Sequence, residues 1–108
     1  MARWMIRTAL AFSLACGASA ALADASPGRA KARACAVCHG EFGISVLPSA
    51  PNLAGQPAFY LVEQLKAYRS GKRANEIMGV IAKPLTDAEM TELSAWFASI
   101  QIEAKPPQ

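Results

Sequence analysis

Two cysteines and a histidine stand within five consecutive residues, in the order Cys35-Ala36-Val37-Cys38-His39. This C-x-x-C-H pattern is the attachment signature of a c-type haem. Two thiols three positions apart can each add to a vinyl group on one edge of a porphyrin, and the histidine that follows can then offer a ring nitrogen to the iron. A chain that carries this motif has to fold around a large apolar group.

Short C-x-x-C pairs also occur in zinc sites and in thioredoxin-like redox sites. Zinc would need two further ligands, but outside the motif the sequence has only Cys16 and no second histidine. A thioredoxin-like pair would stand at the start of a helix that follows a strand, and no such βαβ pattern surrounds these cysteines. We therefore expect one covalently attached haem, with a redox dithiol or a disulfide as the alternative.

The first 23 residues have the features of a secretory signal peptide. Arg3 and Arg7 provide the positive start, and an apolar run extends over residues 8–15. This run is too short to cross a membrane. Ala21-Leu22-Ala23 offers an A-x-A cleavage site, so we expect cleavage after Ala23, with cleavage after Ala20 as the alternative.

Cys16 lies inside this segment and raises the question of a lipid anchor. The residues before it resemble a lipoprotein signal only faintly, because Ser13 stands where a leucine is usual. We expect Cys16 to be removed with the signal peptide. The mature protein, residues 24–108, is then predicted to be a single soluble domain in the periplasm.

Removal of residues 1–23 changes the charge balance of the chain. The eleven basic residues fall to nine, because Arg3 and Arg7 are lost, while the eight acidic residues all remain. With this balance and no stripe of basic and aromatic residues, no nucleic-acid partner is expected. The 85 residues that remain of the 108 can build only a limited core. A buried haem would supply the apolar surface that so short a chain lacks.

The pattern of apolar residues and helix caps predicts an all-α domain. Ser26-Pro27, as N-cap and first helical residue, is expected to open an alanine-rich helix that runs into Cys35 and Cys38. Residues 40–56 are rich in glycine, proline and asparagine, which excludes a long regular element there.

Further helices are predicted in the second half of the chain. Pro57 begins one that ends at Gly71, and residues 75–82 form a short one. Thr86-Asp87-Ala88-Glu89 is a capping box that opens the last helix, which extends to about Gln101. Its apolar face has the spacing of core residues and consists of Leu93, Trp96, Phe97 and Ile100.

Trp96 is expected to pack against the first helix, where Gly28 and Ala32 permit a close approach. Two methionines of the mature chain could supply the sixth iron ligand. Met90 lies in the first turns of the last helix and is interpreted as a core residue. Met78, beside Gly79 and between two helices, is the expected distal ligand, with Met90 or an open site as alternatives.

The mature chain resembles class I c-type cytochromes, in particular the bacterial cytochrome c4/c553-like group. The likeness is carried, in this order, by Cys35-Ala36-Val37-Cys38-His39-Gly40, Pro51-Asn52-Leu53-Ala54-Gly55-Gln56, Tyr60-Leu61, Gln64-Leu65, Gly71-Lys72-Arg73, Met78 and Leu85-Thr86-Asp87. The resemblance implies a small cytochrome c fold of three to five helices wrapped around one haem c.

The same resemblance implies which residues hold the haem. Cys35 and Cys38 would form the thioethers, and His39 and Met78 would be the axial ligands. It also implies that the carbonyl group of Pro51 accepts a hydrogen bond from the other ring nitrogen of His39, which would fix the tautomer and the ring orientation.

Filled axial positions leave no iron site for a substrate, so we expect no enzymatic activity and no small-molecule substrate. The predicted function is that of an exported monohaem c-type cytochrome, a one-electron carrier in a respiratory or oxidative chain. Its partners would be redox proteins, one donor and one acceptor, and it would meet a membrane only through their complexes. One alternative is a haem subunit bound tightly to a periplasmic dehydrogenase. Another is a haem enzyme or sensor with an open distal site.

Four basic residues stand close together in the second half of the chain: Lys66, Arg69, Lys72 and Arg73. They could form a docking patch for an acidic partner, or simply a solvated helix face. Arg73 could also pair with a haem propionate, because a guanidinium group suits a carboxylate.

Overall fold

The computed structural model describes residues 25–108, and within this range the chain is entirely helical and irregular, without a strand. The helices are α1 (Ser26–Ala32), α2 (Ala36–His39), α3 (Ala58–Ser70), α4 (Glu76–Ala82) and α5 (Asp87–Ser99). The predicted all-α fold is therefore confirmed. None of the helices in this part of the chain is long and apolar enough to cross a lipid bilayer. The expected signal peptide, its cleavage site and Cys16 lie outside the described residues.

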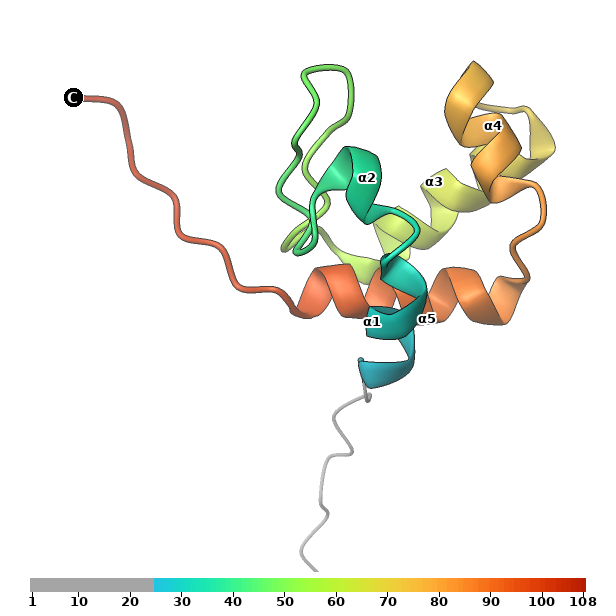
Figure 1. The fold of residues 1–108 in the computed structure, drawn as a ribbon, viewed down its shortest axis with the longest axis horizontal. Helices are drawn as coiled ribbons and strands as arrows, with labels where there is room; N and C mark the ends of the chain where they lie inside the picture. The colour runs from blue at the N-terminus through green and yellow to red at the C-terminus, as the bar shows by residue number, and fades with distance from the viewer. Residues whose placement is uncertain (1–24) are drawn as a thin grey trace, which may run out of the picture.

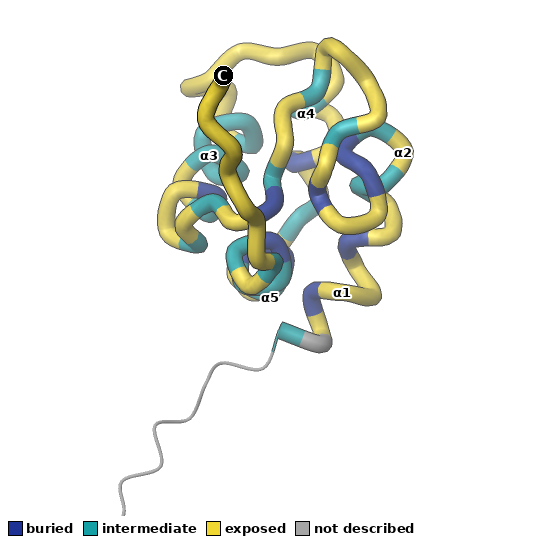
Figure 2. Tube along the Cα trace, turned by 90° about the vertical axis from the view of Figure 1, so that its left-hand side faces the viewer, coloured by how far each residue is buried: buried dark blue, intermediate teal, exposed yellow. Residues whose placement is uncertain are grey.

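The helix α5 is the element on which the others assemble. The closely packed helix pairs are α1 with α5, α3 with α5, and α3 with α4. In Figure 1, α1 crosses α5, while α2 and α4 stand on the same side of α5. The view in Figure 2, turned by 90°, shows the same arrangement. The helix that carries the C-x-x-C-H motif and the helix that carries Met78 therefore lie on the same side of α5.

The core lies where α1, α3 and α5 meet. Its buried cluster consists of Ala32, Leu61, Leu93 and Phe97, and the half-buried side chains packed on it include Trp96 and Ile100. All four residues of the predicted apolar face of α5 are therefore in or against the core. Met90 is fully buried, in agreement with its interpretation as a core residue. Figure 2 shows buried positions on α1, at α5 and beside α2, whereas α4 is largely exposed.

The crossing of α1 and α5 depends on a glycine. A Cβ atom added to Gly28 would overlap the backbone carbonyl of Glu92 and would lie 2.8 Å from Cβ of Trp96. The guanidinium group of Arg29, on α1, lies over the Trp96 ring at 5.5 Å from the ring centre. The predicted close approach of Trp96 to the first helix is confirmed.

Two details of the predicted first helix are wrong. The N-cap is Ala25 and not Ser26, because the backbone of Ala25 is already helical and its carbonyl accepts from the Arg29 N–H at 3.3 Å. The helix also does not continue into the cysteines. The N–H groups of Ala34 and Cys35 bond to carbonyls three residues back, which tightens the chain into a turn before α2 begins. Cys35 thereby becomes the N-cap of α2.

The later helices begin and end close to where the sequence predicts. Helix α3 follows Pro57 and ends at Gly71, which has the left-handed backbone conformation of a helix C-cap. The side chain of Asn75 caps α4 by accepting from the N–H groups of Ile77 and Met78.

The capping box of α5 is complete. The Glu89 N–H donates to the Thr86 hydroxyl at 3.2 Å, and the Thr86 N–H donates to the Glu89 carboxylate at 2.9 Å. These two bonds satisfy backbone groups that a helix start leaves without partners. Hydrogen bonds from the backbone N–H and then the hydroxyl of Thr86 lower the pKa of the Glu89 carboxyl below its ordinary value of 4.5.

This capping box should make stability depend on pH. Because the folded pKa of Glu89 lies below the unfolded value, ionised Glu89 stabilises the fold above pH 4.5, and this contribution is lost as the pH falls through the folded pKa. Glu89→Gln keeps the shape without the charge. We expect the difference in urea midpoint between wild type and this variant to shrink from about pH 6 to about pH 3. A constant difference over this range would show that the carboxylate adds nothing to the cap.

Candidate haem site

The two cysteines of the motif lie at the start and in the body of α2. Both are free thiols and both are half-buried. Burial raises the pKa of the Cys35 thiol, and the neighbouring Cys38 adds to this effect. The short helix, which begins only after the turn at residues 33–35, presents the two sulfur atoms and the following histidine from one compact element.

His39 is the last residue of α2, and its side chain is buried. Its Nδ1 atom lies 2.8 Å from the carbonyl oxygen of Pro51. A carbonyl oxygen can only accept, so Nδ1 carries the proton of this bond. This is the hydrogen bond that the resemblance implies. It fixes the orientation of the ring, and in the tautomer with Nδ1–H the lone pair on Nε2 is the one that can bind a metal ion.

The loop after α2 brings Pro51 to this place. Gly40 ends α2 at φ 78° and ψ 157°, a conformation that only glycine adopts easily, and a Cβ atom there would overlap the carbonyl of Ile44. The loop then closes on itself, because Ser45 N–H donates to Asn52 Oδ1 at 2.7 Å. The Ser45 hydroxyl also donates to the Cys38 carbonyl at 3.2 Å. Asn52 thus holds its neighbour Pro51 against the motif helix.

Met78 lies on α4, in the turn that Asn75 caps, and is half-buried. Figure 1 shows α4 on the same side of α5 as α2, at the opposite end of that side. Within residues 25–108, α2 and α4 are not one of the closely packed helix pairs. The structure therefore brings His39 and Pro51 together directly, and it places Met78 on a separate helix that faces the same region of the fold.

Large apolar side chains remain exposed around these two helices. They lie on α2, the loop after it, the start of α3 and α4: Val37, Phe42, Ile44, Val46, Leu47, Phe59, Tyr60, Ile77, Val80 and Ile81. No large apolar side chain of α5 is exposed in this way. These exposed apolar side chains belong to the elements that carry or adjoin the C-x-x-C-H motif and Met78. Contact with water disfavours apolar surface by roughly 25 cal/mol for each Å², so these residues suit contact with an apolar group such as a porphyrin.

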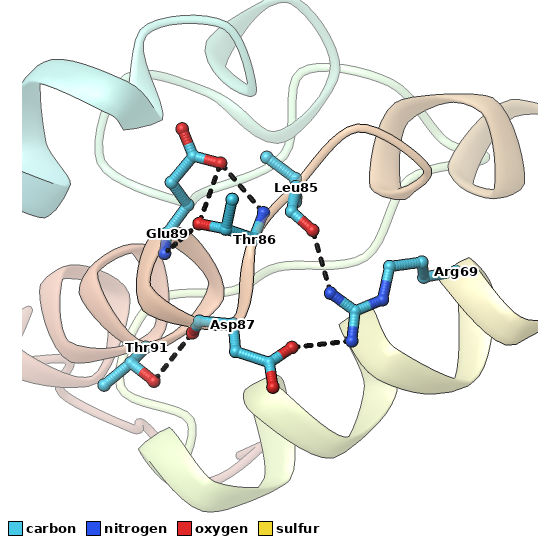
Figure 3. Close-up of polar contacts among 6 residues, drawn as sticks. All are labelled: Arg69, Leu85, Thr86, Asp87, Glu89 and Thr91. Carbon is cyan, nitrogen blue, oxygen red and sulfur yellow. Dashed lines mark hydrogen bonds and ion pairs between the residues drawn. The ribbon is translucent and has the colours of Figure 1, made fainter.

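Two of the four basic residues of the possible docking patch are held by neighbouring groups. Arg69 donates to the Leu85 carbonyl at 2.9 Å and to the Asp87 carboxylate at 2.6 Å, as Figure 3 shows. The hydrogen bond and the charge of Arg69 lower the pKa of the Asp87 carboxyl below its ordinary value.

Arg73, the second of these residues, donates to the Gln64 side chain at 2.7 Å and lies 4.8 Å over the Tyr68 ring. From the sequence, Arg69 is expected only as a charge on a docking patch or on a solvated helix face. No local pattern reveals its contacts, because they depend on the approach of α3 to the start of α5.

Comparison with known proteins shows which protein family the chain matches. Residues 25–101 match the family model described as cytochrome c. The chain is 46% identical over 77 residues to cytochrome c4 of Thiocapsa roseopersicina, a match that covers 70% of this chain and 40% of the relative. It therefore spans about two fifths of the length of that protein. Against cytochrome c-554(548) of Halomonas halodenitrificans it is 38% identical over 79 residues, which cover 70% of this chain and 95% of the relative.

A solved structure shares the fold. The thiosulfate dehydrogenase of Marichromatium purpuratum in its as-isolated form superimposes with a TM-score of 0.69 and 36% sequence identity. The match covers 86% of this chain and 22% of that chain. The arrangement of helices around the motif is thus the same as in part of a larger redox protein.

Proposed function

This chain belongs to the cytochrome c family, a family that binds haem c covalently, and from this premise we propose that it is an exported carrier that passes single electrons between proteins. The observation that carries the proposal is the buried His39, whose Nδ1 donates to Pro51 while Nε2 stays available. A histidine prepared in this way directly after two free thiols suits the attachment and ligation of one haem c.

Four residues of this chain would hold the haem. Cys35 and Cys38 would bind its vinyl groups as thioethers, and His39 would bind the iron from one face through Nε2. Met78 would bind from the opposite face through its thioether sulfur. The bound haem supplies an iron that is stable in both the ferrous and the ferric state.

The surrounding protein groups would adjust the reduction potential of this iron in three ways. The Pro51 carbonyl holds the His39 ring at a fixed angle and keeps its proton on Nδ1. A thioether at Met78 opposite imidazole favours the reduced state. The apolar side chains of α2, the following loop and α4 are exposed and would shield a bound haem from water, which would further disfavour the more highly charged oxidised state. With both axial positions taken, no reaction at the iron and no small-molecule substrate is proposed.

The proposal places the mature protein in the periplasm. Residues 1–23 would be the signal peptide, residues 24–108 the single mature domain, and Cys16 would be lost with the signal. The partners would be a donor and an acceptor protein that make small, transient contacts near the exposed haem edge. Membranes would be met only through such partners.

A haem subunit of a dehydrogenase is the second candidate function. The likeness of 86% of this chain to part of a thiosulfate dehydrogenase structure favours it. A permanent subunit would use an exposed apolar surface for a lasting contact with its partner. The likeness points to no particular substrate for the present chain.

An optical spectrum tests the main proposal. The purified haem-loaded protein is expected to be low-spin in both oxidation states, and the ferrous form is expected not to bind carbon monoxide, because His39 and Met78 occupy the iron. A high-spin ferric spectrum with rapid carbon monoxide binding would contradict the carrier proposal and favour a haem enzyme or a sensor.

Copurification separates the two candidate functions. Isolated from its natural host under mild conditions, a carrier is expected to elute alone at the size of one small domain. Stoichiometric elution with a larger protein that survives repeated chromatography would favour the subunit instead.

A further inference from the structure

The segment that carries Met78 has little core of its own. In α4, Ile77, Val80 and Ile81 are exposed, and only Ala82 is buried. The helix packs against α3 and continues into a short connector, residues 83–86, that leads to α5. Since burial of apolar surface is what usually fixes a helix, other contacts have to hold this one in position.

Arg69 provides such a contact. From α3 its guanidinium group donates to the Leu85 carbonyl in the connector at 2.9 Å and to the Asp87 carboxylate at the start of α5 at 2.6 Å. Figure 3 shows that one bond runs from the guanidinium group to Leu85 in the connector and the other to Asp87 at the start of α5. Among the described residues, no other side-chain hydrogen bond joins α3 to residues 74–86. Arg69 thus fastens the end of the Met78 segment to the rest of the domain.

We propose that Arg69 is a positioning residue for the distal iron ligand: its double hydrogen bond holds the connector so that α4 presents Met78 to the haem. The inference rests on the proposed role of Met78 as that ligand. A charged, planar guanidinium group donates to two acceptors in fixed directions at once. A lysine at this position would carry the same charge, but its ammonium group lacks this fixed fork of donors.

Loss of the Arg69 contacts should favour an open state. In this state the domain remains folded, but the Met78 sulfur is no longer bound to the iron. Imidazole added to the ferric protein binds only to that open state, so its affinity measures how firmly Met78 is held. A residue that merely contributes to overall stability would not change this affinity at a temperature where the protein is fully folded.

Arg73 provides the matched control because it lies four residues further along the chain, in the turn that follows α3. Its guanidinium group binds Gln64 and Tyr68, both of which belong to α3. Arg73→Gln therefore removes one positive charge close to Arg69 and leaves the hydrogen bond between Arg69 and the connector in place.

The experiment is an imidazole titration of haem-loaded ferric wild type, Arg69→Gln, Arg69→Lys and Arg73→Gln, with circular dichroism to show that each is folded. We expect imidazole to bind Arg69→Gln roughly tenfold more tightly than wild type, the size of change expected when a hydrogen bond to a charged group is lost. Arg69→Lys should lie between the two, and Arg73→Gln should stay within about twofold of wild type.

Equal affinities for wild type and Arg69→Gln, or an equal gain in Arg73→Gln, would overturn the inference. If Arg69→Gln does not yield folded protein, Asp87→Asn removes one acceptor charge alone and is expected to tighten imidazole binding by about threefold. An unchanged affinity in that variant would likewise overturn the inference. Failure of the proposed ligand role looks different, because the ferric sulfur-to-iron band would then be absent from wild type or would survive in Met78→Ala.

Discussion

Replacing Met78 by alanine is expected to abolish the ferric sulfur-to-iron absorption band and to open the iron to carbon monoxide and imidazole. The reduction potential should fall by on the order of 100 mV or more, because a thioether ligand stabilises the ferrous state and axial ligands together tune haem potentials over about 0.8 V. The fold should persist, since Met78 is only half-buried and belongs to a helix with little core. Optical titration and potentiometry of the haem-loaded variant measure both effects.

Met90→Ala is the matched control for this prediction. Met90 is fully buried on α5, so its removal should leave a cavity and lower the free energy of unfolding by about 2–5 kcal/mol. The sulfur-to-iron band should remain in this variant. The reverse result, with the band kept in Met78→Ala and lost in Met90→Ala, would assign the distal ligand to Met90.

Gly28→Ala should strongly destabilise the scaffold. The new methyl group would overlap the Glu92 carbonyl and press on Trp96 at 2.8 Å, so α1 and α5 would have to move apart. Because the obstacle is backbone, the cost should lie at the upper end for overpacking, about 3 kcal/mol or more. Urea unfolding of the haem-loaded protein measures the loss.

Gly71→Ala separates this steric effect from a general cost of replacing glycine. A Cβ atom at Gly71 would meet nothing within 4 Å, so only the left-handed backbone conformation at φ 80° is penalised. That penalty is about 1–2 kcal/mol. A Gly28→Ala variant no less stable than Gly71→Ala would show that the helix crossing can relax around a methyl group.

The parts of the fold that could be predicted from sequence have local causes. The start of α5 follows from the Thr86 and Glu89 side chains, and the end of α3 follows from Gly71. The break between α1 and α2 could not be predicted, because the alanine-rich segment favours a continuous helix. A tighter turn replaces the continuous helix at residues 33–35. Beside this turn, Ala32 lies in the buried core and half-buried Cys35 packs against it.

The same distinction applies to the site. The motif residues Cys35, Cys38 and His39 are adjacent in sequence, so their chemistry could be predicted from spacing alone. The Pro51 contact lies twelve residues away and came only from resemblance to a family. The contacts of Arg69 with Leu85 and Asp87 could not be predicted, because they form between helices whose relative placement is set by the core. The ligand role of Met78 stays a prediction.

The contact between α1 and α5 joins the two ends of the domain, and this has a consequence for the order of folding. Gly28 and Glu92 are 64 residues apart, so closing that loop costs the free chain about 4 kcal/mol in entropy. The bonds that place His39 on Pro51, by contrast, close a loop of only twelve residues. Local contacts form first under such conditions. The region around the cysteines should therefore take shape before the two ends of the domain meet.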